Sequence, residues 1–165
     1  MNYFDYLPEK KGRGFCGALL FALSGGIVWY LLRLVGFVPA LGGAVGVIMA
    51  MWGYSLFGGR RSRFGMTASV ISTLLVCLAA WYLCLTGDVF AAYKSWFAAG
   101  EVDFMPTFGQ CFKGAHLFLR EIKIAVSSFR ELGFGLIFTV LGALVNSRAL
   151  NADRKNYNTE RDQSR

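Results

Sequence analysis

The charged residues of this chain are distributed very unevenly, and they leave long apolar stretches between them. Each stretch comes close to the roughly 20 apolar residues that a helix needs to cross the hydrocarbon core of a bilayer. Inside that core, only a helix or a closed barrel satisfies its own backbone hydrogen bonds. We therefore predict an all-α, polytopic membrane protein with four transmembrane helices, at residues 14–33, 38–57, 66–86 and 132–148.

The composition agrees with lipid as the solvent of these stretches. Hydrophobic residues make up 55% of the 165 residues and charged residues only 16%, whereas soluble proteins average about 25% charged residues. A soluble domain of this size could not bury so much apolar surface. The net charge of +7 does not indicate a nucleic-acid partner, because the basic residues flank the apolar stretches instead of gathering on one polar face.

Basic residues are concentrated on one side of the predicted spans. Of the 17 lysines and arginines, eleven lie on the side that holds both termini and six on the other. Because an excess of Lys and Arg marks the cytoplasmic side, we predict a multi-pass protein of the cell (plasma) membrane with both termini cytoplasmic. Three loop residues are expected to fix this topology, with a site for anionic lipid as their alternative role: Arg60, Arg61 and Arg63.

Small residues recur at every fourth position in the predicted spans. Such stripes let helix backbones approach closely, which is how helices associate where lipid removes the hydrophobic driving force. The link between the first two spans is short, so we expect a tight antiparallel hairpin; a homo-oligomer could use the same stripes. The predicted packing residues are Gly14, Ala18, Ala22 and Gly26 in the first span and Gly42, Gly46 and Ala50 in the second.

Several aromatic residues lie near the ends of the spans. Amphipathic rings at such positions are typical of the belts that form at the two membrane–water interfaces. We therefore expect an interfacial role, and not a ligand cage, for six of them: Trp29, Tyr30, Trp52, Tyr54, Trp81 and Tyr82.

Residues 1–150 are predicted to form the transmembrane domain, with one sizeable extracytoplasmic segment at 87–131. In this segment, 89–100 is expected to be a short interfacial helix. Residues 113–130 place apolar and basic side chains on opposite faces, which predicts an amphipathic helix on the outer membrane surface. An apolar face packed on a partner domain would give the same periodicity. The polar cytoplasmic tail, 151–165, is expected to continue the last helix by a turn or two before becoming disordered.

No residue set for catalysis, a cofactor or a metal is predicted. The four cysteines form no CxxC pair, and a lone His116 does not complete a zinc site. A disulfide between Cys84 and Cys111 is conceivable, although free thiols are favoured. The chain has no HExxH or GxSxG motif and no paired carboxylates within its spans, so no enzyme activity is expected.

Three sequence stretches carry a resemblance to a known family. They are GFCGALLFALSGGIVWY in the first span, the pattern GY-x-LFGG-xx-S-xx-G from Gly53 to Gly65, and FTVLGAL in the last span. Over roughly residues 10–150 the chain resembles a family of uncharacterised small four-helix integral membrane proteins of Gram-positive bacteria. The resemblance implies a fold and a compartment, and it implies no reaction.

The spans contain no Asp, Glu, Lys or His, whereas ion-coupled transport normally needs ionisable groups at membrane depth. We therefore expect a structural or accessory protein that interacts with membrane lipids or with a partner membrane protein. The alternative is a small uncoupled transporter or channel, which could act as an oligomer.

Overall fold

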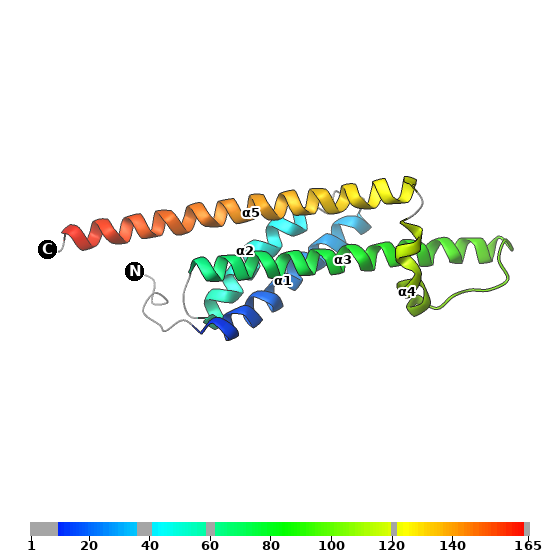
Figure 1. Cartoon of the computed structure of the whole chain (residues 1–165), viewed down its shortest axis with the longest axis horizontal. Helices are drawn as coiled ribbons and strands as arrows, with labels where there is room; N and C mark the ends of the chain where they lie inside the picture. The colour runs from blue at the N-terminus through cyan, green and yellow to red at the C-terminus, as the bar shows by residue number, and fades with distance from the viewer. Residues whose placement is uncertain (1–9, 36–40, 59–61, 120–121, 164–165) are drawn as a thin grey trace.

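The described residues of the chain fold into five α-helices (Figure 1). The computed structural model describes residues 10–35, 41–58, 62–119 and 122–163, and their side chains except those of 122–125, 127 and 149–163. The prediction of an all-α fold is confirmed. The helices are α1 (Lys11–Leu34), α2 (Leu41–Gly58), α3 (Arg63–Ala98), α4 (Phe108–Phe118) and α5 (Ile122–Gln163).

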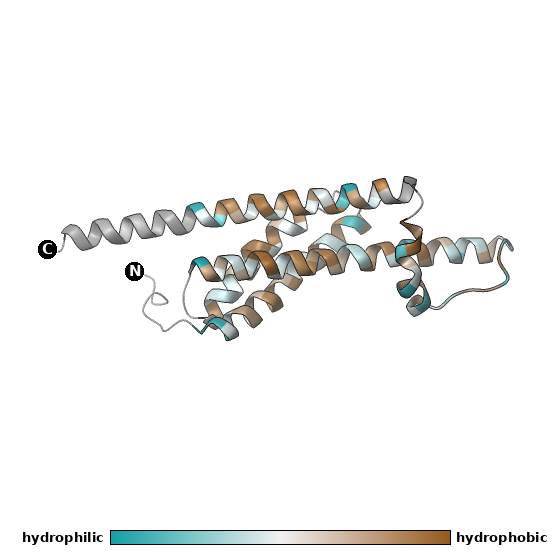
Figure 2. Cartoon of the chain, in the orientation of Figure 1, coloured by the Kyte–Doolittle hydropathy of each residue, from teal (hydrophilic) through white to brown (hydrophobic). Residues whose placement is uncertain are grey.

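Within the part of the chain that the structure describes, four helical segments are long and apolar enough to cross a membrane: Lys11–Leu34, Leu41–Gly58, Arg63–Ala98 and Ser128–Arg148. Figure 2 shows the apolar residues along the middle of the bundle. Large apolar side chains such as Leu20, Ile27 and Val145 are exposed on its surface. Exposing so large an apolar surface to water would be energetically unfavourable, whereas lipid can cover it. The prediction of a multi-pass membrane protein is confirmed.

The membrane-spanning helices are arranged around a central pair, α2 and α3. Helix α1 packs against both of these helices, and α5 packs against the same two. Helices α1 and α5 are joined to each other by long side chains, since Trp29 of α1 reaches the backbone of Gly135 and Arg33 of α1 pairs with Glu131. Helix α1 begins, and α5 ends, at the same end of the bundle (Figure 1).

Helix α3 is much longer than predicted. It has 36 residues, or about 54 Å at 1.5 Å per residue, against a hydrocarbon core of about 30 Å. The prediction of a separate helix at 89–100 was wrong, because Gly87 continues the helix. The helix ends at Ala98, and Gly100 then adopts a φ of 74°, which glycine tolerates without a steric cost.

The single amphipathic helix predicted at 113–130 was also wrong, because two helices share this region. Helix α4 starts at a capping box, in which Thr107 and Gln110 each accept a hydrogen bond from the other's backbone N–H, and it ends at Phe118. Its apolar residue Ala115 is buried against protein. Helix α5 then begins at Ile122 and runs to Gln163, so the tail stays helical well beyond the turn or two predicted.

Candidate functional site

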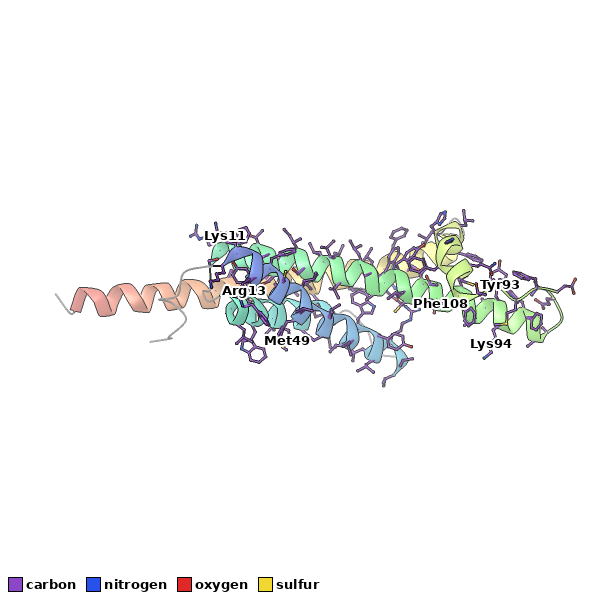
Figure 3. The ribbon with its side chains drawn as sticks, turned by 90° about the horizontal axis from the view of Figure 1, so that it is seen from below. Lys11, Arg13, Met49, Tyr93, Lys94 and Phe108 are labelled. Atoms are coloured by element: carbon purple, nitrogen blue, oxygen red, sulfur yellow. The ribbon has the colours of Figure 1, made fainter. Side chains whose placement is uncertain are left out.

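The two ends of the bundle differ in chemistry. We call the end where α1 begins the basic end, because five exposed cations of the described residues lie there: Lys10, Lys11, Arg13, Arg63 and Arg148. We call the opposite end the α4 end. Figure 3 shows Lys11 and Arg13 at the first of these and Tyr93, Lys94 and Phe108 at the second.

At the α4 end, Arg33 joins three helices through ion pairs. Its Nη1 donates to Oε2 of Glu131 on α5 at 2.8 Å, and its Nη2 donates to Oδ2 of Asp88 on α3. We call these three residues the Arg33 cluster. The side chains of Arg33 and Glu131 are only 27% and 29% exposed, whereas that of Asp88 is 59% exposed. The stability contribution of the cluster should therefore be intermediate. An exposed ion pair contributes about 0–1 kcal/mol, whereas breaking a buried one costs about 3–5 kcal/mol.

Sequence reasoning missed this cluster. Arg33 was assigned only to the end of the first span, and neither acid was assigned a role. A usable signal was present, because Asp88 follows the third predicted span by two residues and Glu131 directly precedes the fourth. In an up-and-down bundle, those positions come to the same depth as Arg33.

One turn below the Arg33 cluster, Trp29 fills the space between α1 and α5. Its ring lies directly over Gly135, where a Cβ would collide with it, and Gly42 of α2 lies against its Cβ. Trp29 is fully buried, so the predicted interfacial position was wrong for this residue. The register is that of antiparallel helices, since Gly135 lies one turn from Glu131 just as Trp29 lies one turn from Arg33.

Near the basic end, Tyr54 makes a matching contact with other helices. It is fully buried, and its ring occupies the places where a Cβ would stand on Gly14, Gly58 and Gly65. These glycines belong to α1, α2 and α3, so one ring joins three helices. The predicted interfacial role was wrong for Tyr54, whereas Tyr30 and Trp52 are half exposed on the bundle surface.

The predicted small residues are packed against neighbouring helices, and so are other glycines outside the predicted stripes. Ala18, Ala22 and Ala50 are fully buried. Gly46 faces Thr73 of α3 and Gly42 faces Gly25 of α1, whereas Gly26 faces Val76 and Ala80 of α3. Three glycines that the stripes did not include are packed as closely, since a Cβ on each would stand 2.5–2.6 Å from the backbone of the other helix: Gly17, Gly25 and Gly53.

This difference follows from helix geometry. A helix has 3.6 residues per turn, so a stripe at every fourth residue winds slowly around its axis. The first-span stripe therefore starts against Tyr54 at Gly14 and has turned toward α3 by Gly26. Positions that alternate between three and four residues apart keep facing the same neighbour.

Of the three predicted loop arginines, Arg60 and Arg61 lie outside the described residues. Arg63 is exposed in the first turn of α3, where the Ser62 side chain caps the helix by accepting from the Gly65 N–H at 3.0 Å. Close by, Lys11 Nζ lies 5.2 Å from the centre of the Phe64 ring. Binding of anionic lipid at this end stays a prediction.

At the α4 end of the bundle, α4 packs against the C-terminal part of α3. Cys111 and Ala115 face α3 and are buried, and the Tyr82 hydroxyl donates to the Phe112 carbonyl oxygen at 2.7 Å. Phe108 and Phe118 pack edge-on against Phe90 and Tyr93. We call this unit, residues 87–118, the head. An apolar groove of about 180 Å³ opens between its two helices, lined by residues that include Val89, Tyr93, Phe104, Pro106, Leu117 and Phe118.

Cys84 lies near the charged side chains of the Arg33 cluster, whereas Cys111 lies on α4. Cys84 and Cys111 are free thiols, and both are buried. Among the described His, Cys, Asp and Glu side chains, no group of three could hold a metal ion. His116 is exposed on α4.

Comparisons with protein-family models, with curated proteins and with solved structures gave no match. The resemblance to small four-helix membrane proteins of Gram-positive bacteria therefore stays a prediction.

Proposed function

We propose that this protein is an accessory membrane protein whose head binds a partner membrane protein on the extracytoplasmic side. One observation carries the proposal: three large aromatic side chains of the head are exposed. Trp96, Phe97 and Phe104 are 37%, 46% and 64% exposed. Exposed aromatic residues of this kind are typical anchors of protein interfaces.

The height of Trp96 and Phe97 favours protein over lipid as their partner. Trp96 and Phe97 lie about 12 Å farther along α3 than Asp88, at 1.5 Å per residue. Asp88 belongs to the Arg33 cluster, which connects the ends of three spans. The headgroup layer on each side of a bilayer is only about 5–8 Å thick, so these rings extend beyond the depth at which lipid would cover them.

The rest of the bundle supports a fixed head. The same helix, α3, that carries Trp96 and Phe97 is packed against α1, α2 and α5. The Arg33 cluster ties α3 to α1 and α5 close to the point where it leaves the bundle. A surface held on such a support loses little conformational freedom when a partner binds.

The test is photocrosslinking in living cells. We would replace Phe97, Phe104 or Leu75 one at a time with p-benzoylphenylalanine. Leu75 is the control, because it is an exposed residue in the middle of α3, the helix that also carries Phe97. The proposal expects one and the same protein, identified by mass spectrometry, to be attached at positions 97 and 104 and not at 75. Absence of a protein adduct at both head positions, or the same adducts at all three, would refute it.

A further inference from the structure

We propose that α4 is an interfacial anchor, which lies in the bilayer leaflet at the α4 end with Phe112 at the boundary between acyl chains and headgroups. Lys113 and His116 would then lie among the phosphates. The ligand class is the phospholipid surface. This inference goes beyond the proposed function and does not depend on a protein partner.

The first argument is depth. About 30 Å of helix separates Arg13 at the basic end from Arg33, which matches the thickness of the hydrocarbon core. The Arg33 cluster therefore marks the level at which the hydrocarbon ends. Helix α4 straddles this level, because it contacts α3 at Tyr82, about 9 Å below Asp88, and at Tyr93, about 8 Å above it.

The second argument is orientation. Figure 1 shows α4 lying across the direction of α3, and thus along the plane of a membrane that the bundle crosses. Cys111 and Ala115 are turned toward α3 and buried. Phe112 lies on another face of α4, where its ring meets that of Tyr82 edge-on at 4.9 Å and stays 42% exposed.

The third argument is continuity with the lipid-facing surface. Below Tyr82, exposed apolar side chains follow α3 at helical spacing: Leu78, Leu75 and Ile71. Phe112 continues this stripe upward through its contact with Tyr82. Acyl chains that cover the stripe would therefore also meet the exposed part of the Phe112 ring.

The fourth argument is charge. The sequence of α4 contains Lys113 and His116 but no acidic residue, and both side chains are exposed. Long basic side chains at an interface extend toward phosphates while their stems stay in apolar surroundings. Aromatic and basic residues together are therefore suited to a headgroup layer.

The experiment compares two phenylalanines of the head. Phe112 or Phe104 is replaced by p-benzoylphenylalanine, which retains the ring, in the full chain reconstituted into vesicles of phosphatidylcholine and phosphatidylglycerol. After irradiation, intact-mass spectrometry measures the fraction of chains that carry one phospholipid. Phe104 is the matched control, because it is the more exposed of the two yet lies on the groove side of the head.

The proposal expects several-fold more lipid adduct at position 112 than at position 104, in variants whose circular dichroism matches that of the unmodified protein. Equal yields, or an adduct of position 112 with the protein's own chain alone, would overturn it. A Tyr82→Phe variant gives a second readout, since loss of the bond to the Phe112 carbonyl should lower the yield at position 112. An unchanged yield would show that this bond does not set the position of α4.

Discussion

Replacing Gly25 with alanine should destabilise the protein, although alanine normally favours a helix. A Cβ on Gly25 would stand 2.6 Å from the Gly42 carbonyl oxygen and 2.6 Å from the Gly46 Cα, whereas ordinary contact starts at 3.4 Å. The backbones of α1 and α2 would thus have to separate by about 0.8 Å. A gap of that size removes about a quarter to a half of the dispersion energy of each contact it opens.

The magnitude follows from two opposing effects. Overpacking of a close interface costs about 1–3 kcal/mol, and exchanging a helical glycine for alanine returns about 0.5–1 kcal/mol. We therefore expect Gly25→Ala to lower the free energy of unfolding by about 1–2 kcal/mol. The matched control is Gly87→Ala in α3, where a Cβ would meet nothing within 4 Å, so only the gain of about 0.5–1 kcal/mol should remain.

The assay is unfolding in mixed micelles with increasing mole fraction of sodium dodecyl sulfate, followed by circular dichroism. Gly26→Ala should fall between the other two variants, because its Cβ would approach closely only the Val76 Cγ1 atom, at 2.9 Å, and a side chain can shift. If Gly25→Ala proved as stable as Gly87→Ala, the close contact between α1 and α2 would not exist in the folded protein.

Three further predictions use other parts of the bundle. Gly46→Leu should be far more damaging than Leu41→Val in thermal unfolding in detergent, because a Cβ at Gly46 already meets the Thr73 Cγ2 atom at 2.8 Å while Leu41 is exposed; equal stability would place Gly46 against lipid. Arg33→Gln should lower the free energy of unfolding by about 1–2 kcal/mol, since it leaves two carboxylates without their cation, and Arg33→Lys should lose less; identical unfolding of wild type and Arg33→Gln would show that the cluster adds nothing. Reporter fusions at residue 62 and at the C-terminus should both behave as cytoplasmic and one at residue 104 as exported, and the reverse result would invert the topology.

Sequence alone could predict the spans, because lipid demands long uncharged helices whatever the partners are. It could not predict which rings are buried. Trp29 and Trp52 look alike in sequence, each in an apolar stretch close to a span end, yet Trp29 is fully buried whereas Trp52 contacts Phe21 and stays half exposed. The difference depends on how each helix is rotated within the bundle, and an apolar stretch without polar residues carries no signal of that rotation.

The break between α4 and α5 was missed for a related reason. Apolar residues keep helical spacing from Ala115 to Phe129, and no proline or glycine interrupts them. Predicting the Arg33 cluster requires the depth of each residue in the membrane in addition to the sequence pattern. Asp88 and Glu131 are ordinary acids in a polar segment until the span ends are aligned, and only then do they meet Arg33.

The two buried rings impose an order on assembly, because a chain is synthesised from its N-terminus. The hairpin of α1 and α2 already contains Tyr54 and two of its glycine partners, Gly14 and Gly58, and the third, Gly65, follows a few residues later in α3. The contact between Trp29 and Gly135 forms much later, because Gly135 lies in the last helix. Until that helix is inserted, the Trp29 ring has lipid or another protein where its final neighbour will stand. A truncated chain that ends before α5 would therefore keep an unfilled docking position beside Trp29, which makes the insertion of α5 the step that completes the bundle.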